Sequence, residues 1–415
     1  MKPLGRQFGW LWASYAISTV GTWLAFDAFP LIAILALHAD PATVSMLAAA
    51  GPAVGALVAL PLGPWVEFRR KRPVMMAMDL IRFLALMSVP VAFAIGRLGL
   101  AQLLIVAIIV AAAGIAFTAA SGAYLKALVP REGLLAANGR LESTNWLAIM
   151  LGPPLGGLAI GLLGPVTTVI VDAVSYLLSA AGIRAIGGHE TPPVRPASSG
   201  FRASELLEGW RYLLAHPDLR PWFFNAILVG GLIMATAPLL AVLMLGRLGF
   251  APWQYGLAFA APGVGGLIGA RLASRLVSRF GQYRVLRAAG VLRVVWSIGL
   301  AFVGAGTGGL MLVMAIELGL ITSMGVFTPV LATWRLERTP ADKLTRALSA
   351  WSIASRAAIA ILTALWGLLA QWIGARGAIA AAGALLLLTP LLLPRKEHTE
   401  ENRALRTLSA DALES

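Results

Sequence analysis

The chain contains no cysteine, which excludes disulfide frameworks, thiolate metal sites and cysteine nucleophiles. It has four histidines (His38, His189, His216 and His398), and none lies within an apolar run, so a histidine metal centre is not expected. We therefore predict no metal and no cofactor. Charged residues are also scarce, at 13% of the chain, whereas 59% of the residues are hydrophobic. Soluble proteins have about 25% and roughly 45–50%, so the composition indicates a membrane protein.

Sequence signatures of common enzymes are missing as well. There is no Gly-Lys pair and hence no P-loop for ATP, and neither G-x-S-x-G nor H-E-x-x-H occurs. The stretch "GAGTGG" (Gly304–Gly309) matches G-x-G-x-x-G, but no predicted strand precedes it. We predict that the protein is not an enzyme. Any transport that it carries out must then be driven by an ion gradient or run downhill.

Long apolar runs recur along the whole chain. Twelve are long enough to cross the roughly 30 Å hydrocarbon core of a bilayer. Their predicted limits are 9–37, 42–66, 73–96, 100–127, 141–164, 165–187, 219–246, 252–278, 283–304, 308–334, 345–372 and 374–394. The first run is too long for a signal peptide and leads into further spans, so we interpret it as an uncleaved helix. The predicted fold is an all-α membrane protein with twelve transmembrane helices.

Basic residues exceed acidic ones, 33 to 19, and their positions indicate the orientation. If both termini are cytoplasmic, only Arg97, Arg247 and Arg376 fall in outer loops. The cytoplasmic loops then carry most of the others, for example in "EFRRKRP" (Glu67–Pro73). This asymmetry follows the positive-inside rule, so we expect a multi-pass protein of the inner (plasma) membrane with cytoplasmic termini. The bilayer, and not a nucleic acid, is the partner that this charge predicts.

One polar segment, Gly187–Ala203, divides the chain. We predict a six-helix half over 1–187, a cytoplasmic linker over 188–218, a second six-helix half over 219–394 and a polar cytoplasmic tail over 395–415. The linker includes an amphipathic helix, which lies in the membrane interface or is a plain soluble connection. The residues on its apolar face are Leu206, Leu207, Trp210, Leu213 and Leu214.

The two halves resemble each other at a spacing of about 210 residues. "PLIAILAL" (Pro30–Leu37) recurs as "PLLAVLML" (Pro238–Leu245), and Arg82 in "DLIR" corresponds to Arg293 in "GVLR". Several such matches in order indicate a tandem duplication. Paired repeats around a central site are how many secondary transporters are built.

With twelve predicted spans, a central linker and repeated halves, the chain resembles the major facilitator superfamily over nearly its whole length. Family members carry a loop pattern close to G-x-L-A-D-R-x-G-R-R, and "GPWVEFRRKR" places Gly63, Glu67, Lys71 and Arg72 on its positions. Glu67 replaces the usual Asp, and two further positions differ. The resemblance implies a cytoplasmic gate that these residues help to latch between conformations. The alternative is a basic loop that only sets the topology.

The stretch "GPPLGG" resembles a fifth-span motif of proton-coupled antiporters in this superfamily. Pro153 and Pro154 remove backbone donors, which predicts a kink. Gly152 and Gly156 are four residues apart, as are Gly157 and Gly161, and such strips let a neighbouring helix approach closely. We expect a bending, closely packed helix between the two halves, and an ordinary packing helix is the alternative.

Charges within the spans are costly and tend to mark a pathway or an ion pair. Asp27 is expected near the middle of the first span, which lines the central cavity in this superfamily. It is the first candidate for proton coupling, against a purely structural ion pair. Glu317 in the tenth span is the second. Arg356 either pairs with Glu317 or extends to the inner surface. For Asp172 we expect a structural hydrogen bond, and for Asp79 with Arg82 a local ion pair.

Together these features predict a secondary active transporter, most similar to the macrolide-efflux and siderophore-export branch of the superfamily. The resemblance implies export of lipophilic or amphipathic small molecules, such as drugs or natural products, in exchange for protons. A proton-coupled importer of a nutrient is the alternative on the same fold, and a non-transporting membrane enzyme or receptor is a more distant one. The sequence leaves the oligomeric state open, and a monomer is among the states it allows.

Overall fold

The computed structural model describes residues 5–25, 27–67, 69–130, 133–187, 190 and 203–394. The described part of the chain is helical and contains no β-strand. The helices before the linker are α1 (Arg6–Leu24), α2 (Ala28–Leu35), α3 (Pro41–Glu67), α4 (Lys71–Ala94), α5 (Leu100–Leu128), α6 (Leu134–Leu163) and α7 (Pro165–Ala185). Those that follow are α8 (Ala203–Ala215), α9 (Arg220–Ala241), α10 (Pro252–Phe280), α11 (Gln282–Val295), α12 (Gly306–Glu337) and α13 (Ala341–Leu388). The predicted tail over 395–415 lies outside the described residues.

The prediction of an all-α membrane fold is confirmed. Ten helical segments are long and apolar enough to cross a membrane, and Pro41–Leu57 of α3 forms a shorter apolar helix. α13 has 48 residues. At about 1.5 Å per residue it is roughly twice as long as one crossing requires. Gly374 interrupts it with φ 75° and ψ 163°, a conformation that glycine adopts without strain. If α13 is counted as two crossings separated at Gly374, and α3 is counted as one more, the ten segments become twelve.

Several spans are less regular than the sequence predicted. The first is divided by Asp27 into α1 and α2. The seventh ends in a π-helical turn over Val242–Arg247, and the ninth in a 3₁₀ turn over Ser297–Phe302. By contrast, α6 is one helix that contains both Pro153 and Pro154. Irregular turns of this kind depend on tertiary contacts that hydropathy does not report.

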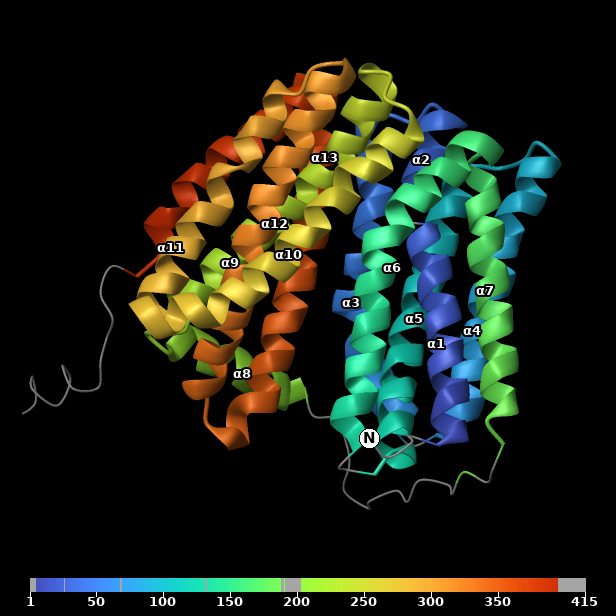
Figure 1. Cartoon of the computed structure of the whole chain (residues 1–415), viewed down its shortest axis with the longest axis horizontal. Helices are drawn as coiled ribbons and strands as arrows, with labels where there is room; N and C mark the ends of the chain where they lie inside the picture. The colour runs from blue at the N-terminus through green and yellow to red at the C-terminus, as the bar shows by residue number, and fades with distance from the viewer. Residues whose placement is uncertain are drawn as a thin grey trace, which may run out of the picture.

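The helices form two groups, α1–α7 and α8–α13, which lie side by side (Figure 1). We call the end where α1 begins and α7 ends the linker end, and the opposite one the far end. In the view of Figure 1 the groups approach each other at the far end, at the top, and diverge toward the linker end. The most extensive contacts between the groups are those of α3 with α13 and of α6 with α10.

The buried core follows the same division. One apolar cluster takes residues from both halves at the far end, including Leu31 and Ile32 of α2 and Leu243 and Met244 of the π-helical turn. These residues belong to the repeated stretches Pro30–Leu37 and Pro238–Leu245, so the two copies of the repeat share one core. The described residues near the linker end form separate clusters in each half. The halves are thus joined at the far end.

Glycines make the close contacts between the halves. A Cβ added at Gly157 of α6 would lie 2.6 Å from the carbonyl oxygen of Pro252 at the start of α10. A Cβ at Gly367 of α13 would lie 2.3 Å from Cβ of Ser45 and 3.3 Å from Cα of Ala42 at the start of α3. Gly157 and Gly367 are about 210 residues apart, as are Ala42 and Pro252. The two seams are therefore equivalent contacts in the duplicated fold.

The linker helix α8 packs against the second half. Leu213 is fully buried, and the ring of Trp210 meets the ring of Phe223 edge-on at 6.1 Å between centroids. Glu208 forms an ion pair with Arg346 of α13. The side chains of Leu206 and Leu207 lie outside the described residues. α8 therefore belongs to the second half in structure.

Candidate functional site

Asp27 occupies the break between α1 and α2. Its backbone is left-handed, with φ 55° and ψ 18°, which is uncommon outside glycine and is tolerated by Asp and Asn. Although it stands at the N-cap of α2, its side chain makes no capping hydrogen bond. The half-buried carboxylate is thus available for a contact beyond its own helix.

That contact crosses to the second half. The hydroxyl of Tyr255 in α10 donates a hydrogen bond to Oδ2 of Asp27 over 2.8 Å, and the Tyr255 side chain is 2% exposed. Nearer the far-end surface, Nε2 of Gln371 in α13 donates to Oδ1 of Asp40 over 3.1 Å. An acidic residue of the first half therefore takes part in both of these hydrogen bonds between the halves.

Glu317, the second sequence candidate, lies in α12 with 8% of its surface exposed. Within the described residues its carboxylate has no hydrogen-bond or ion-pair partner, but it acts electrostatically on the hydroxyl of Tyr255. Tyr255 thus adjoins Asp27 directly and Glu317 at longer range. We refer to Asp27, Tyr255 and Glu317 as the central acidic cluster.

Arg356 is not part of this cluster. Its side chain is exposed on α13 and lies against α3, where a Cβ added at Gly55 would be 2.8 Å from Nη1 of Arg356. In the described part of the chain it forms no ion pair with Glu317. The sequence left open whether Arg356 pairs with Glu317 or extends to the inner surface. The pair is not formed among the described residues.

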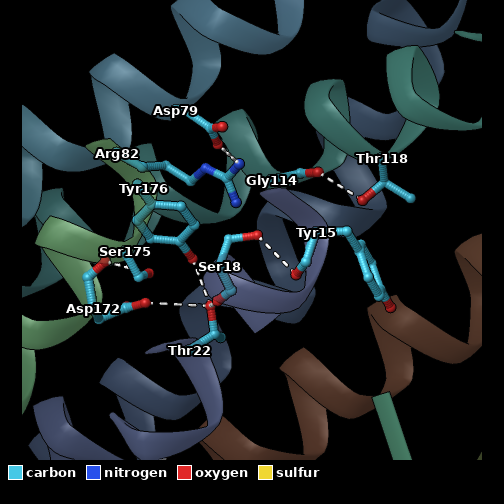
Figure 2. Close-up of polar contacts among 10 residues, drawn as sticks. All are labelled: Tyr15, Ser18, Thr22, Asp79, Arg82, Gly114, Thr118, Asp172, Ser175 and Tyr176. Carbon is cyan, nitrogen blue, oxygen red and sulfur yellow. Dashed lines mark hydrogen bonds and ion pairs between the residues drawn. The ribbon is translucent and has the colours of Figure 1, made fainter. Parts of the chain in front are cut away.

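A second group of buried polar residues lies inside the first half (Figure 2). Asp79 and Arg82 of α4 form an ion pair, as predicted, and the Arg82 guanidinium lies 4.0 Å from the ring centroid of Tyr176 in α7. The hydroxyl of Thr22 in α1 is 2.8 Å from that of Tyr176 and donates to Oδ1 of Asp172 over 3.3 Å. The expected hydrogen bond of Asp172 is therefore present. This polar network ties α1, α4 and α7 together.

The basic loop between α3 and α4 is held within the first half. The carboxylate of Glu190 accepts hydrogen bonds from the backbone amides of Lys71 and Arg72, the latter over 3.1 Å, and so caps α4. The Arg72 guanidinium donates to the carbonyl oxygens of Gly187, over 2.8 Å, and of Arg184, over 3.2 Å. These contacts join the start of α4 to the end of α7.

The remaining residues of the predicted gate lie at the end of α3. Gly63 belongs to the last turns of that helix, and Glu67 is its final residue. The side chain of Glu67 and the whole of Phe68 lie outside the described residues. A latch formed by Gly63, Glu67, Lys71 and Arg72 stays a prediction.

The glycines of "GPPLGG" face two different neighbours. Gly152 and Gly156 lie against the backbone of Trp23 and Leu24 at the end of α1, where added Cβ atoms would come within 2.7 and 2.0 Å of the carbonyl oxygens. Gly157 faces α10 of the second half, as described above. Gly161, which the sequence grouped with Gly157, has no atom within 4 Å of an added Cβ.

Pro153 also takes part in this seam. A Cβ at Gly256 of α10 would lie 2.2 Å from the carbonyl oxygen of Pro153, so α6 and α10 approach at backbone distance from both sides. Neither Gly256 nor Tyr255 was identified from the sequence. Both lie one turn into α10, and no motif in the sequence analysis includes them.

An all-helical membrane chain of two joined halves, with acidic groups where the halves meet, has the architecture of a secondary transporter. Residues 11–333 match the model of the Major Facilitator Superfamily, and the chain belongs to that family. It is a multi-pass membrane protein and a transporter, not an enzyme.

Two relatives are multidrug efflux pumps named Tap. The chain is 26% identical over 280 residues to the pump of Mycolicibacterium fortuitum, covering 66% of this chain and 67% of the pump. It is 28% identical over 268 residues to that of Mycobacterium tuberculosis, covering 61% and 62%. The alignments thus leave about a third of each pump unmatched.

Solved structures share the fold at lower identity. The nucleoside transporter NupG has a TM-score of 0.74 at 11% identity, with 93% of this chain and 98% of that one covered. A bacterial homologue of the iron transporter ferroportin, in an inward-facing state, has a TM-score of 0.75 at 18% identity, with 94% and 98% covered. At 11% and 18% identity, the similarity to these structures shows a shared fold and nothing about the substrate.

Proposed function

We propose that the protein exports lipophilic or amphipathic small molecules in exchange for protons. The observation that carries this proposal is the hydrogen bond from Tyr255 to Asp27, which places a carboxylate on the seam between the halves. A carboxylate can take up and release a proton, and its contact with Tyr255 depends on how the halves are arranged. The similarity to multidrug efflux pumps supports the substrate class and the direction.

The coupling would work through this bond. A hydrogen bond to an ionised carboxylate is stronger than one to a neutral acid, so ionised Asp27 favours the arrangement that is closed at the far end. Substrate that enters from the linker end opens the far end at the cost of the bond. In the open state Asp27 faces water, and closing the far end would have to remove that water from an ionised carboxylate. A proton from the outside neutralises Asp27 and removes this cost, so the far end closes again without substrate. Release of that proton to the cytoplasm restores the bond.

The bond between Tyr255 and Asp27 would also limit the leakage of protons through the empty carrier. An empty carrier with ionised Asp27 is held closed at the far end, so it cannot return the ionised site to the outside. Glu317 lies within electrostatic range of Tyr255 and is the second acidic group of the same site. We propose that it binds a second proton or a cationic substrate. Arg356 on the α3–α13 seam adds a positive charge at the boundary of the two halves.

The direction of transport requires an orientation. We propose that the linker end is cytoplasmic, in the plasma membrane, because nearly all basic residues outside the spans lie at that end. The halves are then residues 1–187 and 219–394, joined by the linker over 188–218. Reporter fusions after Arg97 and Arg247 should report an outer location. An inner location at either site would reverse the proposed direction.

The decisive experiment is flux in proteoliposomes with a panel of lipophilic compounds, with and without an imposed pH gradient. The wild-type protein should accumulate substrate only with the gradient. Asp27→Asn should abolish accumulation yet retain exchange of one substrate molecule for another. Asp40→Asn is the matched control, because it removes a carboxylate on the same seam but in the far-end loop. Uphill transport by Asp27→Asn at the wild-type rate would exclude this residue as the coupling site.

Tyr255→Phe tests the bond itself. It keeps the ring but cannot donate to Asp27, so the carrier should leak protons in the absence of substrate. Uptake that follows the gradient into right-side-out vesicles, instead of export, would favour an importer on the same fold.

A further inference from the structure

A groove on the second half combines an apolar wall with an arginine that forms no ion pair with any described residue. It encloses about 470 Å³ between α10, α11 and α12. Phe280 and Arg284 lie at its linker end, whereas Leu292 and Val326 line it farther into the membrane. From Arg284 to Leu292 the helix rises roughly 12 Å, at 1.5 Å per residue. The groove therefore reaches from the end of the helices well into the hydrocarbon region.

The walls of the groove offer an apolar surface. Phe280 and Leu292 are 47% and 49% exposed, so large side chains stand open along it. Its two hydroxyl groups are already bonded within α12, since Thr322 donates to the carbonyl oxygen of Leu318 and Ser323 to that of Gly319. A hydrocarbon chain would leave no polar group of the groove unsatisfied.

The charge at the groove is unbalanced. Arg284 is exposed, and within the described residues it has no hydrogen-bond or ion-pair partner. Residues 219–316 contain no Asp or Glu, although five arginines lie around the α10–α11 turn. These are Arg271, Arg275, Arg279, Arg284 and Arg287. Residues 219–316 thus present positive charge at one end of an apolar groove and contain no acidic residue to balance it.

We infer that this groove binds an anionic phospholipid, with the phosphate at Arg284 and an acyl chain along Leu292 and Val326. Basic recesses between transmembrane helices bind anionic headgroups in this manner. The first half provides a comparison. A groove of about 530 Å³ between α1 and α7 is lined by apolar residues, Gly21 and Ser175, and by no charged residue. It lacks the cation, so it should not distinguish anionic from zwitterionic lipids.

The test uses the full-length protein, purified in detergent and titrated with defined lipids. Native mass spectrometry should show retention of dioleoyl phosphatidylglycerol in preference to dioleoyl phosphatidylcholine. Arg284→Gln should lower the apparent affinity for the anionic lipid about fivefold, the effect of one basic residue near an anionic surface. Arg275→Gln, which removes the same charge outside the groove, should change it less than about twofold. Equal losses in both variants would indicate diffuse attraction and overturn the site.

A second pair of variants tests the apolar part. Ala288→Phe should fill the groove and abolish retention of phosphatidylglycerol, whereas Val174→Phe fills the α1–α7 groove and should leave it unchanged. A phosphatidylglycerol with a photoreactive acyl chain should label peptides that contain Leu292 or Val326. Labelling confined to residues 170–178 would contradict the assignment. So would binding of soluble glycerol phosphate that persists in Ala288→Phe, because that would indicate a phosphate site without a lipid.

Discussion

The two halves bury an arginine at equivalent positions, but each half gives it a different polar partner. Arg82 lies 4.6 Å from the ring centroid of Phe117, and Arg293 lies 3.5 Å from that of Phe327. Arg82 and Arg293 are about 210 residues apart, and so are Phe117 and Phe327. Arg82 is paired with Asp79, whereas Nη2 of Arg293 donates to Oδ1 of Asn225 over 2.6 Å. The duplication kept the cation on its aromatic ring and changed its polar partner.

The difference concerns net charge. The position that corresponds to Asp79 is Gly290, and the one that corresponds to Asp172 is Ala382, so the second half has neither carboxylate. In the first half, two acids and one arginine form a charged network. In the second half, an amide bonds a cation that is 3% exposed. An ion pair that loses one member leaves a buried charge, whereas an amide partner is lost at a smaller cost.

The largest effect should follow from Asp79→Ala. It leaves Arg82 buried without its acid, which should cost about 3–5 kcal/mol of stability. Thermal unfolding of the purified protein would measure this. The double variant Asp79→Ala/Arg82→Leu removes both charges and should recover most of the loss. A single variant as stable as the wild type would show that the carboxylate does not balance Arg82.

In the second half, Asn225→Ala should cost about 1.5–3 kcal/mol, the range for a hydrogen bond to a charged group. The same unfolding measurement applies. Asn225→Asp supplies Arg293 with a carboxylate and recreates the arrangement of the first half, so it should be more stable than Asn225→Ala. The comparison between the halves fails if Asn225→Ala is as damaging as Asp79→Ala.

The equivalent glycines Gly157 and Gly367 of the two seams should respond alike to substitution by valine. Gly157→Val would press against a backbone oxygen, which cannot move aside, and overpacking of this kind costs about 1–3 kcal/mol. We expect flux to fall about tenfold at normal expression. Gly367→Val would meet Cβ of Ser45 at 2.3 Å, and because that atom is fixed to the backbone of α3 the effect should be similar. Gly161→Val is the control, since an added Cβ there meets no atom within 4 Å. Normal flux in Gly157→Val would reduce "GPPLGG" to an ordinary packing feature.

The smallest expected loss of stability follows from removing the cap at the start of α3, which differs from the cap at the start of α10. Oδ1 of Asp40 accepts from the amides of Ala42 and Thr43, over 2.9 and 3.1 Å, whereas in the second half the Gln254 side chain accepts from the amide of Ala251 over 2.8 Å. Asp40→Ala should cost about 0.5–2 kcal/mol as a lost helix cap. Asp40→Asn keeps an acceptor and should cost less. Thermal unfolding of Asp40→Ala and Asp40→Asn, compared with the wild type, measures how much the cap contributes to stability.

The cap should also be independent of pH in the physiological range. Slight burial raises the pKa of Asp40, but hydrogen bonds from Thr43, Gln371 and the backbone outweigh it and place the pKa below its ordinary value. A lowered pKa in the folded state adds stability above the unfolded pKa of about 3.9, and that stability is lost as the pH falls through the lower value. The difference in stability between wild type and Asp40→Ala should therefore be constant from about pH 5 to 8. A change within that window would mean that another group titrates with the cap.

Hydropathy and the basic loops were sufficient to predict the fold, because each span is a local property of about twenty residues. The ion pair of Asp79 with Arg82 was also predictable, since its members are one helical turn apart. The bond from Tyr255 to Asp27 was not, because it joins residues 228 positions apart and depends on a left-handed break within the first span. The sequence could not decide whether Arg356 pairs with Glu317 or extends to the inner surface, because spacing along two helices does not fix how they rotate against each other.

The equivalence of the two seams has an evolutionary consequence. Under the repeat, α3 corresponds to α10 and α6 to α13, so the α3–α13 seam and the α6–α10 seam are one contact seen from both sides. This is the property of an isologous interface between two identical subunits. A half-length ancestor would have carried both sides of the joint and would have paired with itself.

Fusion of the two copies then permitted asymmetry. In a dimer of identical halves, any bond across the joint occurs twice. Here Tyr255 corresponds to Ser45, and the counterpart of Asp27 is an alanine, so the acid and its donor occur once. A single carboxylate bonded across the seam is an arrangement that two identical chains could not provide.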